Sequence, residues 1–421
     1  MTNISLTGIH FGDEGKGKME GYLLETAIPP FHVVARYGGA DNAGHTSTEE
    51  DRSGRKIINH LVPGGILKPG IYNIILADVM VDPIELVKEI MYLEREGYVV
   101  SPENFGISSR AQMTLEYHKE FEREREEKKG KEAIGTTMKG VGPTAISKYA
   151  REPVRFEEFL SYDSFRRLLG SFSRERGNVV AKEVDVDRYI GMYGEAIEFL
   201  RQFRVDEAEV IRRLKDKNWI YEGSQGILLD VLYGSVPYVT SSTPHNPPPD
   251  TDERIGVAKA YITRVGGGNL PTRMEEGIEK MIRGCVDKTP GAEFGATTGR
   301  PRNCGWFDAV ATKYAVSIGR IDKIALIKLD RLSGLPVIKV GTKYRIRGDV
   351  TKSFPADRFD FEEARGVYEE YPGWPDDISS AREFRDLPIN GQDYVKRLED
   401  MMECRIAYVS VGQGSEQTIE R

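Results

Sequence analysis

Short apolar runs alternate with amphipathic segments through the first hundred residues of the chain. The runs at 3–9 (NISLTGI) and 32–37 (HVVARY) are typical of buried strands, and each ends in a glycine-rich loop. A third run at 71–81 precedes a helix-like segment at 82–97 (DPIELVKEIMYLEREG). Strands that alternate with helices predict an α/β fold with a large, mainly parallel central sheet flanked by helices. Ligands usually bind at the loops that follow the carboxyl ends of such strands.

The rest of the chain continues this pattern without a clear boundary. Further strands are expected at 218–223, 323–330 and 405–412. The segment 115–132 mixes both signs of charge, which is typical of a solvated helix. The prolines at 243–250 (TPHNPPPD) exclude regular structure there, because proline fixes φ and lacks an amide donor. Since the sequence shows no internal repeat or linker, we expect 1–421 to form a single domain with insertions.

Composition excludes several classes of protein. With 39% hydrophobic and 30% charged residues the chain resembles an ordinary folded enzyme. A net charge of -7 and the lack of a basic stripe argue against a nucleic-acid-binding protein. No run reaches the roughly 18 apolar residues of a membrane helix, and the first residues lack a secretory signal. The three cysteines, Cys285, Cys304 and Cys404, form no CxxC pair, so we expect a reducing, cytoplasmic location.

The first chemical signal is the heptapeptide Gly12-Asp13-Glu14-Gly15-Lys16-Gly17-Lys18. Glycines let a backbone approach a phosphate closely, and amides at a helix start point toward it. Lys16 or Lys18 can add a positive charge. The spacing is not that of a Walker loop. Asp13 is out of place beside a phosphate unless it binds a cation or takes a proton.

The second signal is Asn42-Ala43-Gly44-His45-Thr46, directly after the second strand. It places an amide, an imidazole and a hydroxyl on one flexible loop, which favours a catalytic role for His45. His10, His32, His60 and His118 show no ligand spacing, and the sequence assigns no role to His245 in the proline-rich loop. We expect the three tryptophans to pack in the core and Cys304 to be a small buried residue.

These stretches resemble the adenylosuccinate synthetase family, in order and over nearly the whole chain. Besides the two loops, the resemblance is carried by the following segments: HLVPGGIL at 60–67, VDPIELVKEI at 81–90, IGTTMKGVGPT at 134–144, YEGSQGILLD at 221–230, VPYVTSS at 236–242, AYITRVGGG at 260–268, FGATTGRPRNCGWFD at 294–308, IKLD at 327–330 and SVGQGSEQTI at 410–419.

The resemblance implies a carbon–nitrogen ligase that uses GTP and Mg²⁺. The γ-phosphoryl group of GTP would move to O6 of IMP, and the amine of L-aspartate would then displace phosphate at C6. Asp13 would take the N1 proton and bind Mg²⁺ together with the Gly44 carbonyl. His45 would donate to the transferring phosphoryl group. Both roles suit general acid–base chemistry beside an electrostatic phosphate site.

The family's binding positions map onto this sequence as a larger set. For phosphate and GTP they are Gly12, Asp13, Glu14, Gly15, Lys16, Gly17, Lys18, Gly44, His45, Thr46, Arg302, Lys328, Asp330, Ser410 and Gly412. For the acceptor nucleotide they are Asn42, Thr137, Arg151, Gln225, Thr240 and Arg300, and for aspartate Thr297, Thr298, Arg300 and Arg302. Arg151 matches an arginine that reaches the partner subunit's site, which implies a homodimer.

Five stretches depart from the family pattern. His10-Phe11 stands for Gln-Trp, Asp41 for the first histidine of GGHNAGHT, and Met138-Lys139 for Gly-Arg. The stretch SSTPHNPPPD replaces SSNTTAGG, and Arg331 and Ser333 replace Val and Asp after the IKLD segment. All five surround the nucleotide pocket and leave the acid–base pair intact.

These departures leave the acceptor open. A phage branch of the family uses dGMP in place of IMP, and its members often lack the acid at the position of Asp13. Retention of Asp13 therefore favours IMP, whereas the altered pocket favours GMP or dGMP. Asp330 favours GTP over ATP as the donor. A homologue that binds GTP without catalysis is the alternative of another class, although binding alone would not require both Asp13 and His45.

Overall fold

The computed structural model describes residues 2–130, 133–174, 180, 184–284, 292–295 and 299–421. Contacts divide the chain into two compact units, each built from several segments. Unit 1 comprises Met1–Asn3, Ala27–Gly44 and Glu49–Ser224, and unit 2 comprises Ile4–Thr26, His45–Thr48 and Gln225–Arg421. The candidate catalytic residues Asp13 and His45 both belong to unit 2.

The strands form a ten-stranded sheet with the order β20-β19-β15-β11-β1-β10-β2-β5-β7-β9. Within each unit, neighbouring strands of this sheet are parallel except for β19 and β20. The expected α/β class with a mainly parallel sheet is confirmed. The strands are β1 (Ile4–Gly8), β2 (Val33–Arg36), β5 (Tyr72–Ile75), β7 (Phe105–Ser108), β9 (Arg204–Val205), β10 (Trp219–Gly226), β11 (Glu253–Lys259), β15 (Lys323–Ile327), β19 (Arg405–Ser410) and β20 (Thr418–Glu420).

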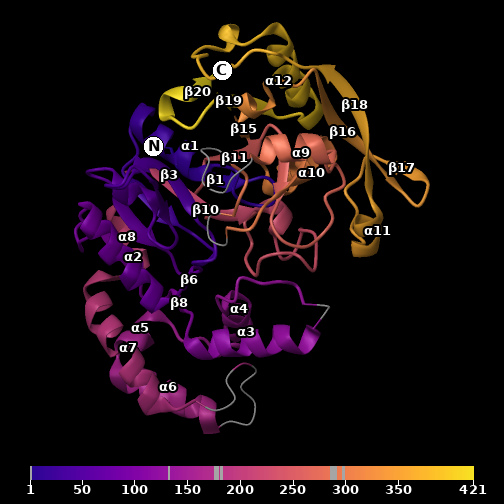
Figure 1. Cartoon of the computed structure of the whole chain (residues 1–421). Coiled ribbons are helices and arrows are strands. Elements are labelled where there is room, and N and C mark those ends of the chain that lie inside the picture. Colours follow the sequence, from indigo (N-terminus) through magenta and orange to yellow (C-terminus); the bar gives the residue numbers. More distant parts are fainter. Residues whose placement is uncertain (1, 131–132, 175–179, 181–183, 285–291, 296–298) are drawn as a thin grey trace. The chain divides into compact units, whose positions relative to one another are not determined.

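In unit 2, every residue of β1 is buried, so the strand is covered on both faces. Helix α10 packs against β11, and α12 packs against β19. A second sheet of β14, β16, β17 and β18 carries the long hairpin drawn in orange in Figure 1. The further elements of unit 2 are α1 (Lys16–Thr26), β12 (Ile262–Arg264), α9 (Glu276–Arg283), β13 (Asn303–Gly305), β14 (Phe307–Asp308), α10 (Ala309–Gly319), β16 (Val337–Ile346), β17 (Asp349–Thr351), α11 (Arg358–Glu363), β18 (Arg365–Pro372) and α12 (Ile389–Met402).

In unit 1, helices cover a core rich in aromatic residues. Helix α2 (Pro83–Glu96) shows how the sequence sets its ends: the Asp82 carboxylate accepts from the amides of Ile84 and Glu85, and Gly97 closes the helix at a φ of 98°. Helices α3 and α4 lie side by side in Figure 1. The further elements are β4 (Lys56–Asn59), β6 (Met80–Val81), β8 (Gln112–Met113), α3 (Glu116–Lys129), α4 (Val141–Ala150), α5 (Phe156–Leu160), α6 (Tyr162–Arg174), α7 (Val186–Leu200) and α8 (Glu207–Arg213), with β3 (His45–Glu50) beginning in unit 2.

Most predicted strands are present, but the apolar run at 71–81 is not one strand. It divides into β5 and β6, because the chain leaves the sheet after Leu76. The Val79 amide donates to the Leu76 carbonyl and closes a turn, while the Ala77 amide donates to the Glu207 side chain. The segment 243–250 has neither helix nor strand, as its prolines predicted.

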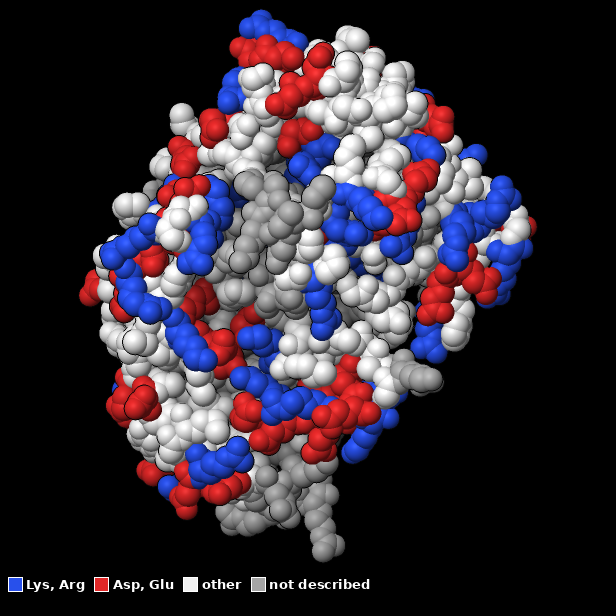
Figure 2. Space-filling model, viewed as in Figure 1, with Lys and Arg blue, Asp and Glu red and all other residues white. Residues whose placement is uncertain are grey.

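Helix α3 is less exposed than its charges predicted. Both signs of charge are interspersed on its visible face in Figure 2. Two of its carboxylates nevertheless point inward: Glu126 accepts from the Gly135 amide at 2.9 Å and Glu122 from the Gly140 amide at 2.7 Å. The helix therefore anchors both ends of the loop at 135–140. No helix among the described residues is long and apolar enough to cross a membrane.

The expectations for core residues also hold. Trp219, Trp306 and Trp374 are buried in hydrophobic clusters. Cys304 is fully buried, and burial raises the pKa of its thiol to about 12, so it is a packing residue and no nucleophile. His245 holds the proline-rich loop, since its Nδ1 lies 2.6 Å from the buried Asp230 carboxylate.

Candidate active site

The predicted phosphate loop joins β1 to α1 in unit 2. Its backbone is left-handed at Gly12 (φ 85°), Asp13 (φ 56°) and Gly15 (φ 100°). Such a conformation costs a non-glycine residue on the order of 1 kcal/mol, so the surroundings must hold Asp13 in place. The buried Glu14 carboxylate does part of this by accepting from the Gly12 amide at 2.7 Å and from Lys16 Nζ at 2.9 Å. Glu14 thus shapes the loop from inside.

The second loop lies against the start of α1. A Cβ atom added at Gly17 would meet the Thr46 carbonyl oxygen at 2.4 Å, so only glycine fits there. His45 is buried, with 5% of its surface exposed. The structure therefore brings His45 and Thr46 beside the phosphate loop, as the paired glycine loops predicted.

A buried carboxylate, Glu293, organises the charges next to this loop. Its oxygens accept from Lys259 Nζ at 2.8 Å, Lys328 Nζ at 2.6 Å and the Tyr261 hydroxyl at 2.5 Å, and it also pairs with Arg302. We call these five residues the Glu293 cluster. The three cations hold the pKa of the Glu293 carboxyl well below its usual value although burial acts in the opposite direction.

Asp13 is joined to this cluster through Arg302, whose second nitrogen lies 2.5 Å from Asp13 Oδ2. Burial by itself would raise the pKa of the Asp13 carboxyl. The positive charges of Arg302, Lys259 and Lys16 outweigh burial and hold that pKa below its usual value. Asp13 is therefore ionised at neutral pH, and its side chain is still 27% exposed. An ionised, accessible carboxylate can accept a proton or bind a cation.

Lys18 marks another part of the predicted phosphate and GTP site. Its ammonium donates to Ser410 Oγ at 2.5 Å and to the Gly412 carbonyl at 2.7 Å. Burial lowers its pKa to about 8, against the attraction of Asp330 and Glu416. The Oδ1 atom of Asp330 is buried and accepts no hydrogen bond from the described residues. This carboxylate oxygen is suited to accept from a ligand.

Gln225 and Thr240, two residues of unit 2 that are predicted to bind the acceptor, are linked through Ser242. Ser242 Oγ lies 3.2 Å from Gln225 Oε1 and 3.3 Å from Thr240 Oγ1, which makes a short hydrogen-bonded chain. Gln225 has a positive φ of 55° and is largely buried. The Thr240 amide is fixed by the Leu229 carbonyl at 2.8 Å. Within unit 2, Gln225 and Lys328 (φ 63°) thus share with Asp13 a positive φ at a predicted site position.

Unit 1 carries three further candidates. Asn42 lies in a tight turn that the Ala43 amide closes onto the Ala40 carbonyl. Thr137 is exposed in the loop between α3 and α4. Arg151 is exposed and left-handed (φ 68°) at the end of α4, where its amide donates to carbonyls of the last turn. Its side chain makes no ion pair with the described residues, which suits a group that reaches elsewhere.

The aspartate-binding positions are only partly described. Thr297 and Thr298 lie outside the described residues. Arg300 is exposed, and its carbonyl accepts from the Gly295 amide at 2.9 Å. Arg302 and Lys328 are both engaged by Glu293 in this structure, so each would have to share or exchange that partner on binding a ligand.

Glu293, Lys259, Tyr261 and Ser242 were missed by the sequence interpretation. A signal was present for Lys259, because a lysine in the apolar strand VAKAYI is unusual unless it is paired. Ser242 is the last residue of the family motif VPYVTSS at 236–242. Glu293 offered no signal, since nothing in the sequence shows that its partners at 259, 302 and 328 converge.

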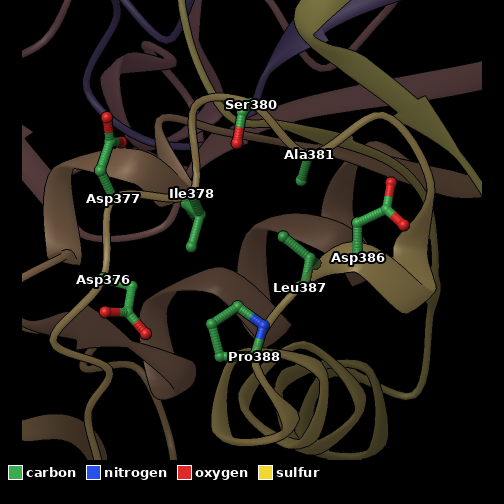
Figure 3. Close-up of a pocket in the computed structure, with 8 residues that line it drawn as sticks. All are labelled: Asp376, Asp377, Ile378, Ser380, Ala381, Asp386, Leu387 and Pro388. Atoms are coloured by element: carbon green, nitrogen blue, oxygen red, sulfur yellow. The ribbon is translucent and has the colours of Figure 1, made fainter.

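The described part of the chain also contains a separate cavity of about 530 Å³, shown in Figure 3. It is lined by Asp376, Asp377, Ile378, Ser380, Ala381, Asp386, Leu387 and Pro388. Two of its carboxylates already accept hydrogen bonds from their own turns, Asp377 from Ser379 and Asp386 from Glu383. None of the candidate site residues lines it.

A glycine loop at a helix start, two buried lysines and an ionised carboxylate define an α/β enzyme that handles phosphorylated ligands. Comparison with known proteins gives the family. The adenylosuccinate synthetase model matches residues 5–419. The adenylosuccinate synthetase of Caldanaerobacter subterraneus is 39% identical over 98% of both chains. The chain belongs to the adenylosuccinate synthetase family and is a carbon–nitrogen ligase.

Solved structures agree with this assignment. The fully ligated adenylosuccinate synthetase of Plasmodium falciparum superposes with a TM-score of 0.89 at 29% identity and covers both chains completely. The succinoaminodeoxyadenylate synthetase of cyanophage S-2L, bound to dGMP and dATP, gives a TM-score of 0.59 at 19% identity, over 100% of this chain and 95% of the other. That second likeness is one of fold alone.

Replacing Glu293 by Gln should destabilise unit 2. The substitution keeps the size of the side chain but removes the carboxylate that Lys259 and Lys328 share, and it leaves Arg302 paired with Asp13 alone. Breaking a buried ion pair in this way typically costs about 3–5 kcal/mol. We expect a lower urea midpoint, measured by fluorescence. Glu276→Gln is the matched control, because Glu276 is 81% exposed and its one ion pair among the described residues is with Lys280. Equal midpoints for both variants would contradict a central role for Glu293.

Proposed function

We propose that this ligase joins L-aspartate to C6 of IMP and uses GTP to activate the oxygen that leaves. Asp13 takes the N1 proton of IMP, and O6 then attacks the γ-phosphorus of GTP, so that GDP departs. The aspartate amine adds at C6 of the 6-phosphoryl nucleotide, loses a proton, and inorganic phosphate leaves. The observation that carries this proposal is the Asp13 carboxylate, held ionised by Arg302, Lys259 and Lys16 on a phosphate loop.

His45 supplies the complementary role. The backbone of His45 and Thr46 packs on Gly17 at the start of α1, and this supports a position of the imidazole near the loop that would hold the γ-phosphate. From there it would donate a hydrogen bond to the oxygens of the transferring group, where negative charge accumulates. Lys16 and the loop amides would supply further positive potential.

The residues present fit Mg²⁺. This ion commonly takes one or two carboxylates, and substrate phosphates and water complete its six ligands. Asp13 offers an accessible carboxylate and Gly44 a backbone carbonyl directly before His45. Bound there, Mg²⁺ would neutralise charge on the phosphates. The described residues contain no cluster of three or more His, Cys, Asp or Glu side chains that could hold a metal by themselves, which suits an ion that shares its ligands with the substrate.

GTP is the favoured donor. Asp330 presents a buried oxygen that no described residue satisfies, and guanine offers N1 and N2 donors to such an acceptor. Adenine lacks that pair of donors. Lys328 would complete the base site, and Lys18, Ser410 and Gly412 line the same region. Aspartate would be held through its carboxylates by Thr297, Thr298, Arg300 and Arg302.

The acceptor would be held by Asn42, Thr137, Arg151, Gln225, Thr240 and Arg300. The hydrogen-bonded chain from Gln225 through Ser242 to Thr240 fixes part of this set. The departures at Asp41, Met138-Lys139 and the proline-rich loop keep GMP or dGMP as the alternative acceptors. The retained Asp13 and the identity of 39% to an adenylosuccinate synthetase support IMP.

The functional form would be a homodimer, and each chain would form a single domain. Arg151 is exposed without an ion pair among the described residues, as expected for an arginine that acts in the partner's site. The two units interleave along the sequence, so no single cut separates them, which supports one domain over 1–421. A cytoplasmic location stays a prediction from the cysteine pattern.

One assay tests the function. Purified protein with Mg²⁺ and L-aspartate is given IMP, GMP or dGMP, each with GTP or ATP, and released phosphate and the nucleotide product are measured. We expect turnover with IMP and GTP. Faster turnover with dGMP than with IMP would show that the enzyme catalyses the phage type of reaction. If no pair of acceptor and donor released phosphate, the protein would be a GTP-binding homologue without catalytic activity.

Asp13→Ala and His45→Ala should each abolish turnover while the fold persists. The first removes the proton acceptor and the second removes a donor to the transferring phosphoryl group, each worth about a hundredfold or more in rate. Steady-state kinetics with a thermal melt of each variant checks this. His32→Ala is the control, because His32 directly precedes β2 (Val33–Arg36), at the opposite end of that strand from the loop that carries Asn42 and His45. Residual turnover near the wild-type rate would remove the residue from the mechanism.

Arg151→Ala should weaken acceptor binding only in the assembled enzyme. If the arginine acts across the interface, a mixed dimer of one Arg151→Ala chain and one Asp13→Ala chain should recover about half of the wild-type dimer's activity, because one of its two sites then has both groups. Activity of the mixture is compared with each variant alone. No recovery on mixing would place Arg151 in its own subunit's site.

A further inference from the structure

An ion pair in unit 1 links two loops that carry candidate nucleotide-binding residues. Lys139 Nζ lies 3.1 Å from Asp41 Oδ2. Asp41 directly precedes Asn42, and Lys139 follows Thr137 by two residues. Both members of the pair are departures from the family pattern described above. The pair therefore joins the turn of Asn42 to the loop of Thr137.

The pair is built into the protein, because Asp41 is only 4% exposed and Lys139 29% exposed. A second carboxylate, Glu85, lies 3.7 Å from Lys139, and Asp82 and Lys119 act on Asp41 electrostatically. A buried carboxylate without its cation is costly, so the contact is worth more than an exposed surface pair.

Each loop is anchored on its far side. The Thr137 loop is tied to α3 at both ends, by Glu126 at Gly135 and by Glu122 at Gly140. The Asn42 turn is tied to β6, because Ala40 pairs with Met80 and the Met80 amide donates to the Gly39 carbonyl at 2.9 Å. Lys139 lies between these two anchored segments and bridges them. A contact at this point fixes their separation.

We propose that the Asp41–Lys139 ion pair is a positioning device that sets the spacing between Asn42 and Thr137 for the phosphate of the acceptor nucleotide. The inference rests on the proposed function, since it assumes that both residues bind that phosphate. Lys139 then acts on the nucleotide through Asp41 and the loops. A phosphate held from two loops requires their separation to be constant within a fraction of an ångström.

The alternative is that Lys139 itself binds the phosphate. The two roles differ in what Asp41 does. If Lys139 is a direct ligand, removing the Asp41 charge frees the ammonium and strengthens nucleotide binding. If the pair is a positioning device, removing either charge loosens both loops and weakens binding.

The test is a double-variant cycle with Asp41→Asn, Lys139→Met and the double variant, read out as KM for the acceptor and kcat. Each single variant should raise KM about tenfold, as expected for a coupling of 1.4 kcal/mol, with a much smaller change in kcat. The double variant should resemble either single variant within about twofold, because the contact can be lost only once. Lys139→Arg, which keeps the charge, should restore KM to near the wild-type value.

Lys339→Met is the matched control. Lys339 is 27% exposed and pairs with Glu275 at 2.7 Å in unit 2, and neither residue belongs to a candidate binding loop, so its loss should leave the acceptor KM unchanged. Thermal melts identify any variant that does not fold, and Lys139→Gln then replaces Lys139→Met in the cycle.

Three results would overturn the proposal: a lower KM for Asp41→Asn, additive effects in the double variant, or unchanged KM in both single variants. Failure of the proposed function is distinguished by the wild-type enzyme in the same assay. If the wild type turns over no acceptor, the ligase assignment fails; if it turns over and the cycle gives one of these three results, only the positioning role fails.

Discussion

The chemistry of this protein depends on one buried carboxylate. Glu293 is fully buried among Lys259, Lys328, Arg302 and the Tyr261 hydroxyl, and its charge is what allows these cations to lie so close together. Arg302 also pairs with Asp13, so the position of this cluster determines which positive charge lies next to the phosphate loop. Without Glu293 the charges of Lys259, Lys328 and Arg302 would repel one another, and these three side chains would lose the partner they share beside Asp13.

The local backbone geometry also helps to fix the candidate site residues. Asp13, Gln225 and Lys328 all have positive φ, a conformation that non-glycine residues adopt only when their surroundings require it. Each is held by contacts from distant segments: Asp13 by Arg302, Gln225 by Ser242, and Lys328 by Glu293. Among the described residues, four of the eight non-glycine positions with positive φ are ones that the family motifs assign to ligands: Asp13, Arg151, Gln225 and Lys328. We interpret this as preorganisation, because the side chains are fixed before a substrate arrives.

The departures from the family pattern have a physical explanation in part. Asp41 adds a negative charge where the family has histidine, and Lys139, which keeps the positive charge of the family's arginine, pairs with it. The proline-rich loop is held by the pair of His245 and Asp230. His10 is buried and bonded to Thr312, and burial together with the charge of Lys259 lowers its pKa to about 3, so the ring is neutral. Nothing in the structure explains why Ser333 stands after the IKLD segment beyond its bond to Trp374.

The sequence alone determined the class of fold, the family and the presence of two glycine-rich loops after the first two strands, because these depend on local patterns: apolar runs for strands, glycines and lysines for a candidate phosphate loop, and motifs that occur in the family's order. It did not place the break after Leu76, the inward carboxylates of α3 or the Glu293 cluster. These features depend on residues up to several hundred positions apart, such as Asp13 and Arg302, whose meeting is decided by strand order and packing. The tertiary structure decides which charged side chains are buried and which partners they contact, and these two factors set their pKa values. A local sequence pattern contains neither kind of information.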